Sequence, residues 1–180
     1  PHFLFNTINN IDILITKDPE EASVYLKKLS DMMRFMPYQT KGEEIPLSKE
    51  LDYIEKYIEL QKIRTSNQNY VHYEVNGESR QKKIAPMIFI PFIENAFKHA
   101  SNNKVNEAVN IGIQIKEEAI IFKCQNRFQK HKTTKNGDNG LGNDLIQKRL
   151  HLLYPNKHSL KVSKLEDQYS VELTLMNGTV

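Results

Sequence analysis

The chain has 180 residues, of which 39% are hydrophobic and 26% are charged, and its formal net charge is +3. This composition supports a packed core and excludes wholesale disorder, and so small a net charge gives no argument for direct binding of nucleic acid. The single cysteine, Cys124, excludes an internal disulfide and a cysteine-rich metal site. No apolar run approaches the ~20 residues that cross a bilayer, and Pro1 is not an initiator methionine, so we expect part of a longer chain.

The first third of the chain carries three helical patterns. Apolar residues recur at helical spacing over residues 3–16, and a second run covers residues 19–37, with Pro19 at a favoured first position. The short turn between them predicts an antiparallel helical hairpin. A polar connection then leads to a third helix over residues 47–64. The apolar positions expected to face inward in the first helix are Leu4, Ile8, Ile11 and Ile15.

The remainder changes to the alternating pattern of strands. Such alternation covers residues 71–75, 109–115 and 120–124, and it returns in a final pair around Glu166 and Asp167. Glu117 and Glu118 have the character of a hairpin tip between the second and third of these strands. Two further helices are predicted at 86–100 and 141–154, separated by a polar, glycine-containing loop at 130–140. The outline is a helical hairpin followed by an α+β sandwich.

His2 and Asn6 are polar residues in an apolar segment, one helical turn apart. At 100° per residue, His2 lies about 150° from the apolar arc of the first helix, and Asn6 falls on the same outer side. One interpretation is a pair of ordinary surface residues. The other is chemical, because an exposed neutral imidazole is a competent nucleophile near neutral pH.

The segment PFIENAFKHA, residues 91–100, divides sharply around the helical wheel. Its apolar residues share one arc, and the complementary arc carries Glu94, Asn95, Lys98 and His99. A solvated helix face explains these four residues. The functional alternative is a single site, in which Asn95 offers an oxygen to Mg²⁺ and Lys98 faces phosphates.

Gly140 and Gly142 stand next to the predicted start of the last helix. Glycines there let backbone N–H groups approach a phosphate, and the helix N-terminus favours the anion. Loops also contain glycine for steric reasons, so this pattern alone decides nothing.

Four segments together resemble the LytS-type sensor histidine kinases. PHFLFNTINNI followed by LSDMMRF resembles the phosphoacceptor segment, and IPLSKELDYIEKYIELQKIR resembles the segment that follows it in that family. PFIENAFKHA is similar to the family's asparagine box, and GLGNDLIQKRLHLLYP to its glycine-box helix. The resemblance runs in the family's order over nearly the whole chain.

The resemblance implies a fold and a division of the chain. Residues 1–45 would form a truncated dimerisation and phosphoacceptor hairpin, and residues 46–180 an ATP-binding α/β sandwich of the GHKL (Bergerat) type. A lid over the nucleotide would cover about residues 127–141.

The resemblance also implies roles for residues. ATP, with Mg²⁺, would phosphorylate His2, while Asn95 matches the magnesium-coordinating asparagine and Glu94 the acidic residue of the same box. Lys98 and His99 would belong to the nucleotide site with the lid glycines. The further candidate residues are Gly140, Gly142, Asn126 and Asn6.

The family context predicts partners and a location. The phosphoryl group would pass to an aspartate of a response regulator, commonly one with a LytTR domain, and the kinase would act as a homodimer without binding nucleic acid itself. The whole protein would be a bacterial membrane sensor, tethered upstream, with this part in the cytoplasm.

The chain departs from the family pattern at the adenine contact. Related kinases carry an aspartate that accepts the adenine amino group, where this chain has Asn126, and Asn143 stands where leucine is usual after Gly142. The residue after His2 is Phe3 rather than an acid that serves as a base in some other kinases. The alternative function is therefore a degenerate kinase that acts as a nucleotide-binding scaffold or as a phosphatase for its regulator.

Overall fold

The computed structural model describes residues 2–35, 44–63, 65, 67–100, 105–128, 138–165 and 167–176, with only the backbone of residues 2, 35 and 138–143. The helices are α1 (His2–Ile15), α2 (Pro19–Phe35), α3 (Leu47–Lys62), α4 (Ile90–His99) and α5 (Asp138–Leu153). The strands are β1 (Ile45–Pro46), β2 (Val71–Asn76), β3 (Lys83–Ile84), β4 (Val109–Ile115), β5 (Ala119–Arg127), β6 (His158–Leu165) and β7 (Gln168–Met176). Within this described part, no helix is both long and apolar enough to cross a membrane.

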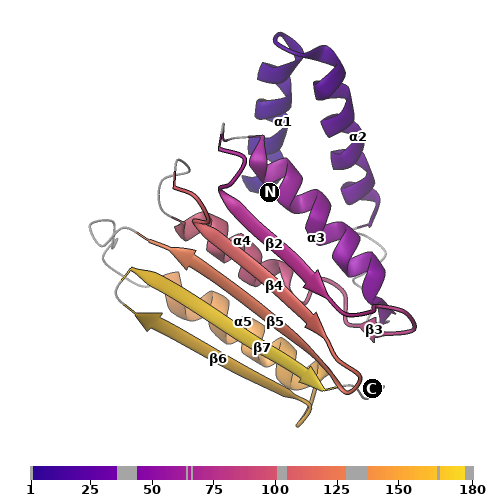
Figure 1. Cartoon of the computed structure of the whole chain (residues 1–180), viewed down its shortest axis with the longest axis vertical. Coiled ribbons are helices and arrows are strands. Elements are labelled where there is room, and N and C mark those ends of the chain that lie inside the picture. Colours follow the sequence, from indigo (N-terminus) through magenta and orange to yellow (C-terminus); the bar gives the residue numbers. More distant parts are fainter. Residues whose placement is uncertain are drawn as a thin grey trace.

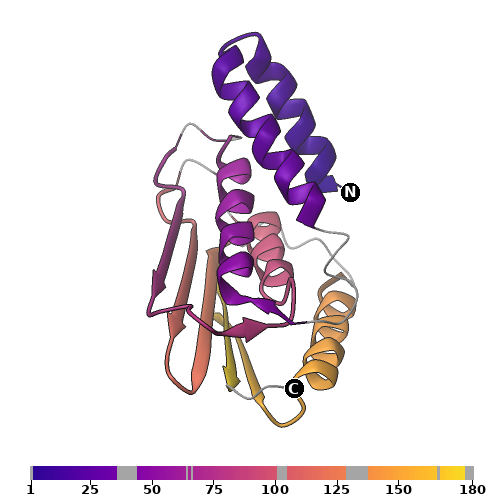
Figure 2. The ribbon, with the colours of Figure 1, turned by 90° about the vertical axis from the view of Figure 1, so that its right-hand side faces the viewer.

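Five strands form one mixed sheet in the order β2-β4-β5-β7-β6. β2 and β4 are parallel, and the other neighbours are antiparallel. Figures 1 and 2 show α3, α4 and α5 on one side of this sheet, with the α1–α2 hairpin projecting beyond it. The short strands β1 and β3 make a separate antiparallel pair at the start of α3.

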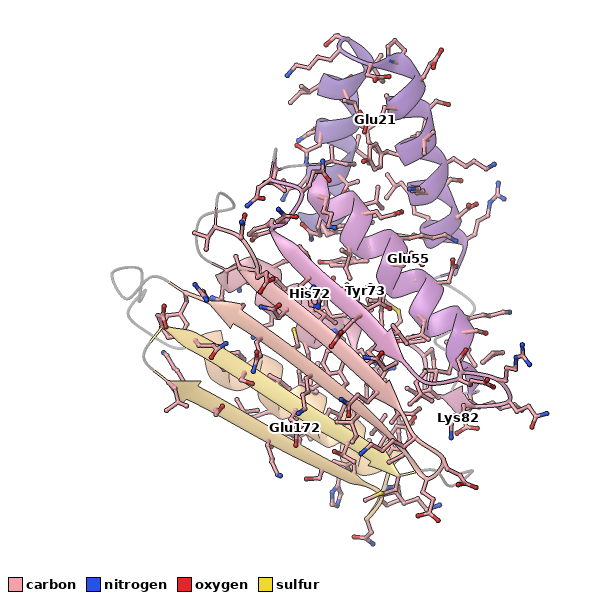
Figure 3. All side chains as sticks on the ribbon, in the orientation of Figure 1. Glu21, Glu55, His72, Tyr73, Lys82 and Glu172 are labelled. Atoms are coloured by element: carbon pink, nitrogen blue, oxygen red, sulfur yellow. The ribbon has the colours of Figure 1, made fainter. Side chains whose placement is uncertain are left out.

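The sandwich core lies between the sheet and α3, α4 and α5. Alternate residues of β4 and β5 point inward, as the period of a strand requires, and Phe122 stacks on Phe89 with ring centroids 4.6 Å apart. The opposite sheet face is polar: Glu172 forms ion pairs with Lys123 at 3.2 Å and with Lys161 at 3.7 Å. Figure 3 shows Glu172 on this uncovered face. One face of the sheet is therefore buried, and the other is exposed to solvent.

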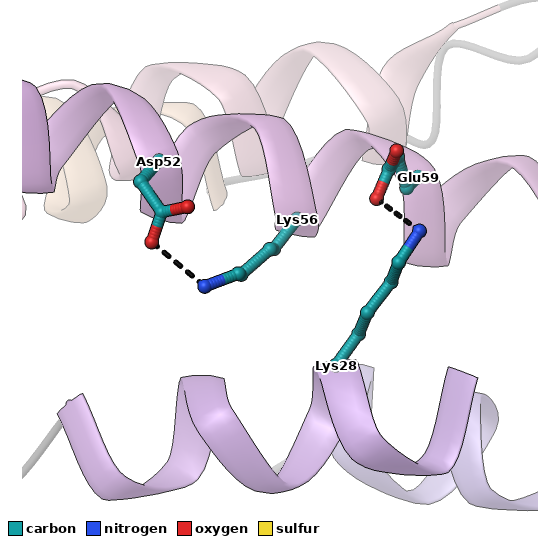
Figure 4. Close-up of polar contacts among 4 residues, drawn as sticks. All are labelled: Lys28, Asp52, Lys56 and Glu59. Atoms are coloured by element: carbon teal, nitrogen blue, oxygen red, sulfur yellow. Dashed lines mark hydrogen bonds and ion pairs between the residues drawn. The ribbon is translucent and has the colours of Figure 1, made fainter. Parts of the chain in front are cut away.

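The two helices of the hairpin pack against each other through a narrow stripe of buried side chains, and one flank of the hairpin contacts α3. Thr7 and Ile11 of α1 are buried against α2, whose buried residues are Ala22, Leu29 and Met32. On the flank, the Lys28 ammonium of α2 lies 2.6 Å from the Glu59 carboxylate of α3 (Figure 4). The hairpin is thus joined to the sandwich through α3.

The predicted elements are confirmed with small shifts of their ends, but the predicted inward face of α1 is only partly right. Ile11 is buried and Leu4 half-buried, whereas Ile8 and Ile15 are exposed. The reason is that α2 covers one side of α1 and α3 meets it near Phe3, so the buried stripe of α1 is narrower than the apolar arc of its sequence. A strip of apolar side chains remains on the hairpin surface.

The helix predicted at 86–100 begins later, at Ile90. Residues 86–89 form an irregular turn in which Met87 adopts a left-handed backbone with φ of 53°. Pro91 stands in the first turn of α4, where a missing N–H costs nothing. Pro91 is the local sign of this later start, whereas the conformation of the turn itself is held by side chains from other helices.

Candidate functional site

α4 presents the polar arc that the sequence predicts. Phe92, Ile93 and Ala96 are buried, whereas Glu94, Lys98 and His99 are exposed and Asn95 is half-buried. Partial desolvation raises the pKa of Glu94 above its ordinary value, which makes its carboxylate a better proton acceptor near neutral pH. The four candidate residues of α4 therefore lie on one accessible side of the helix.

Asn126 lies at the inner face of β5 and is only 2% exposed. Neither the oxygen nor the nitrogen of its side-chain amide has a hydrogen-bond partner. A buried amide left without partners costs on the order of 1–3 kcal/mol, so its retention in a core strand calls for a hydrogen-bonding partner from outside the chain, a ligand or an ordered water. An amide that offers one acceptor and donors beside it is complementary to the edge of adenine.

Asn126 and the polar arc of α4 belong to the same region of the sandwich. α4 runs along β5, because Phe89 stacks on Phe122 and the Cys124 thiol lies 3.9 Å from the Phe92 carbonyl oxygen. Two residues further along β5, about 6.6 Å, correspond to about four residues further along α4, which is within one residue of Asn95 when counted from Phe92. Asn126 consequently lies at about the level of Asn95.

The protein donors alone do not make a metal site. Among the residues that the structure describes, no group of three or more His, Cys, Asp or Glu side chains is placed to hold a metal ion. Asn95 offers one amide oxygen. Mg²⁺ keeps several waters and takes substrate phosphates as ligands, so a single protein oxygen fits an ion that arrives with a nucleotide.

The start of α1 packs against the helices of the sandwich. Phe3, the residue after His2, stacks on Tyr57 of α3 with centroids 4.5 Å apart, and Tyr57 meets Phe97 of α4 edge-on at 5.9 Å. These contacts bring the backbone of His2 to the side of the molecule where α4 lies. The His2 side chain itself is outside the described part.

Asn6 was expected on the outer side of α1, and this is wrong: Asn6 is half-buried. It lies one turn before the half-buried Asn10, on the flank of α1 where Phe3 meets α3. A third helix covering that flank is a tertiary feature that the helical wheel of α1 does not contain.

The glycines of the last helix lie differently from the prediction. α5 starts at Asp138 rather than near Leu141, so Gly140 and Gly142 fall within its first turns instead of in front of it. An acidic residue is favoured at a helix start, which suits Asp138. The predicted lid, about 127–141, lies mostly outside the described residues, which end at Phe128 and resume at Asp138.

Sequence reasoning missed a polar cluster beneath the start of α4. Glu50 of α3 is fully buried, and Arg149 of α5 reaches the same turn. The sequence does carry a signal that Glu50 is buried. Glu50 lies three residues after Leu47 and four before Ile54, and this helical spacing puts its carboxylate on the apolar face of α3.

Comparisons with known proteins agree with the fold and with the motifs. A family model described as "Histidine kinase" matches residues 1–69. The sensor protein kinase HptS of Staphylococcus aureus, in strains USA300 and COL, is 36% identical over 129 residues, which is 70% of this chain and 24% of HptS. The chain thus spans about a quarter of the length of the curated relatives it matches.

Two solved structures of the catalytic domain of histidine kinase ThkA, both nucleotide-free, resemble this chain with a TM-score of 0.52. Their identities are 13% and 12%, and each match covers 76% of this chain and 97% or 98% of the other. At such identity the likeness concerns the fold alone, and it confirms the expected α+β sandwich.

Proposed function

This chain belongs to the LytS-type sensor histidine kinase family, and we propose that it is a kinase portion that uses ATP to phosphorylate His2. The observation that carries the proposal is Asn126, a buried amide without partners at the level of the polar arc of α4. The contact of Phe3 with Tyr57 adds support. Tyr57 of α3 in turn meets Phe97 of α4, so the segment of His2 is brought toward α4.

Each candidate residue has a chemical task in this proposal. Asn126 binds the adenine edge, Lys98 and His99 face the phosphates, and Asn95 holds Mg²⁺, whose charge neutralises phosphate oxygens. The backbone at Gly140 and Gly142 approaches the phosphates from the start of α5. The protein thereby contributes chiefly positioning and charge neutralisation, as phosphoryl transfer requires.

The transfer step involves one bond made and one broken. A ring nitrogen of neutral His2 attacks the γ-phosphorus, and the bond from that phosphorus to the oxygen bridging to the β-phosphate breaks, so that ADP leaves. The proton of the imidazole passes to Glu94 or to water. The raised pKa of Glu94 suits this acceptor role.

The two parts of the chain serve two tasks in this proposal. Residues 1–45 carry the phosphoacceptor and the dimer contact, and residues 46–180 bind the nucleotide beneath a lid at about 127–141. The exposed apolar residues of the hairpin support a homodimer, because such a strip is unusual on a monomer. They include Phe5, Ile8, Ile15, Leu26 and Met33.

The phosphoryl group then passes to a response-regulator aspartate, and a LytTR-type regulator is the partner we propose. The likeness to a sensor kinase also supports a place in a membrane-bound sensor of which this is the cytoplasmic portion.

Labelled ATP with Mg²⁺ tests the proposal directly. We expect an acid-labile, base-stable label on the chain, which His2→Gln abolishes and which His72→Gln, a change on the exposed sheet face, leaves unchanged. A label that survives His2→Gln contradicts the assignment. Nucleotide binding with no label on the unmodified chain would favour the scaffold alternative.

A further inference from the structure

The turn that leads into α4 is held by side chains from two other helices. The Glu50 carboxylate of α3 accepts hydrogen bonds from the backbone N–H of Met87 at 2.8 Å and of Phe89 at 3.5 Å. From the other side, Arg149 of α5 donates to the carbonyl oxygens of Met87, at 3.2 Å, and of Pro86. Met87 is therefore bonded to α3 through its N–H and to α5 through its carbonyl.

A third bond ties the same segment to the end of α5. The hydroxyl of Tyr154, one residue beyond α5, accepts the backbone N–H of Ala85 at 2.8 Å in a buried position. The three side chains of Glu50, Arg149 and Tyr154, here called the clamp, thus bond five backbone groups of residues 85–89, a segment that belongs to no helix.

The clamp holds a conformation that the segment does not favour by itself. The left-handed φ of 53° at Met87 costs a non-glycine residue on the order of 1–3 kcal/mol, and such residues persist where the surroundings determine them. Glu50 is 0% exposed, so its carboxylate is retained in the core at the expense of its hydration. Burial raises its pKa to about 7, against the opposing effect of the backbone N–H groups and of Arg149.

The clamp connects the two elements that flank the proposed nucleotide site. The segment it holds ends at Phe89, the residue that caps α4, and α4 carries Glu94, Asn95 and Lys98. No side chain caps the start of α4 locally, so the direction in which α4 leaves the turn depends on the clamp. Arg149 lies in α5, the helix whose first turns carry Gly140 and Gly142.

From this arrangement we propose that Glu50 and Arg149 are positioning residues, which set the place of α4, and with it Asn95, relative to α3 and α5. The inference rests on the proposed function of the site. Nucleotide recognition then has two separate parts. Asn126 of β5 contacts adenine independently of the clamp. The magnesium and phosphate contacts are made by α4 and depend on the clamp.

Binding measurements with adenosine and with ATP, each with and without Mg²⁺, test this division. We expect Arg149→Met to leave adenosine affinity unchanged and to reduce the gain in ATP affinity that Mg²⁺ provides by about fivefold, the usual effect of one lost hydrogen bond. Arg149→Lys, which keeps the charge and one donor, restores part of that gain. Lys148→Met is the matched control, because Lys148 is the exposed neighbour of Arg149 on α5, and it changes neither affinity.

A double-mutant cycle sharpens the test. After Asn95→Ala, Arg149→Met should cause little further loss, since both changes act through the same magnesium contact. Tyr154→Phe removes only one hydroxyl and should reduce the Mg²⁺-dependent gain by about twofold, so the test holds even where Arg149→Met fails to fold.

Full retention of the Mg²⁺-dependent gain in folded Arg149→Met, or in both Arg149→Lys and Tyr154→Phe, overturns the inference. A reduction that affects adenosine and ATP equally also overturns it, because it marks a general loss of structure. An unmodified chain that binds neither adenosine nor ATP contradicts the proposed function instead.

Discussion

The hairpin and the sandwich differ in how completely each buries its apolar residues. In the sandwich, Phe122, Ile113 and Leu173 have no exposed surface. In the hairpin, Phe5 is 69% exposed and Leu26 is 55% exposed. The sandwich thus encloses a core of its own, and its exposed large apolar residues in the described part lie on α5, on β6 and at the end of β7, whereas the hairpin exposes apolar residues along both of its helices, as an element that packs against a partner does.

The difference also separates the two proposed tasks. Residues that bind a substrate are best held by a rigid, self-sufficient core, and these lie in the sandwich. The phosphoacceptor segment lies in the part that leans on the sandwich through a few contacts, chiefly the ring of Phe3 on Tyr57 and the ion pair of Lys28 with Glu59. A segment held by few contacts can move between partners at little cost.

The largest expected effect tests the completeness of the sandwich. Phe122→Ala should lower the free energy of unfolding by about 3–5 kcal/mol, because it leaves a cavity in a closed core. Leu26→Glu should change that of the dilute chain by no more than about 0.5 kcal/mol, since the side chain already faces water. Denaturant unfolding measures both, and sedimentation of Leu26→Glu should show a weakened dimer. Equal destabilisation by the two changes would erase the distinction between the regions.

The next effect concerns the carboxylate inside the sandwich. The pKa of Glu50 in the folded chain is raised to about 7 from 4.5, so between these values the folded state binds more protons than the unfolded one. Its contribution to stability therefore falls as pH rises through this window, by about 3 kcal/mol in all, and is flat above it. The unfolding free energy of the unmodified chain relative to Glu50→Gln should decline accordingly between pH 4.5 and pH 8. A difference that stays constant with pH would mean that Glu50 is ionised normally.

A smaller effect tests the contact between the two regions. Phe3→Ala removes the ring that stacks on Tyr57, and we expect phosphorylation of His2 to slow by about tenfold, because alignment of the acceptor is lost. Nucleotide affinity should not change, since Asn126 and α4 keep their places. Asn9→Ala, at an exposed polar site on the same helix, is the control. Equal rates in Phe3→Ala and the unmodified chain would show that this contact plays no part in transfer.

The smallest effect concerns adenine. Asn126→Asp replaces a neutral acceptor by a charged one, and it should tighten ATP by on the order of 1 kcal/mol, or about fivefold. Asn126→Leu should weaken binding by a similar amount or more, because the adenine amino group then loses its acceptor. Calorimetric titration compares the three chains. No change in either variant would mean that Asn126 does not contact the base.

The sequence alone determined the features that repeat along the chain at short range. The period of 3.6 in α1, α2 and α3 and the period of 2 in β4 and β5 follow from which side chains share a face. The same helical period predicts the two arcs of α4 residue by residue. The predicted hairpin tip at Glu117–Glu118 is confirmed by the pairing of Ile115 with Ile120.

The tertiary structure decided whatever depends on residues far apart in the chain. The parallel pairing of β2 with β4 has no short-range signature, because parallel strands are joined by long connections. Burial of Asn126 without partners appears only once α4 covers β5. The start of α4 at Ile90 is fixed by Glu50, 37 residues before Met87, and by Arg149, 62 residues after it. Local helix propensity constrains the end of a helix less than such buried hydrogen bonds do. The sequence therefore indicates which helices and strands form, whereas tertiary packing decides where they begin and which residues they face.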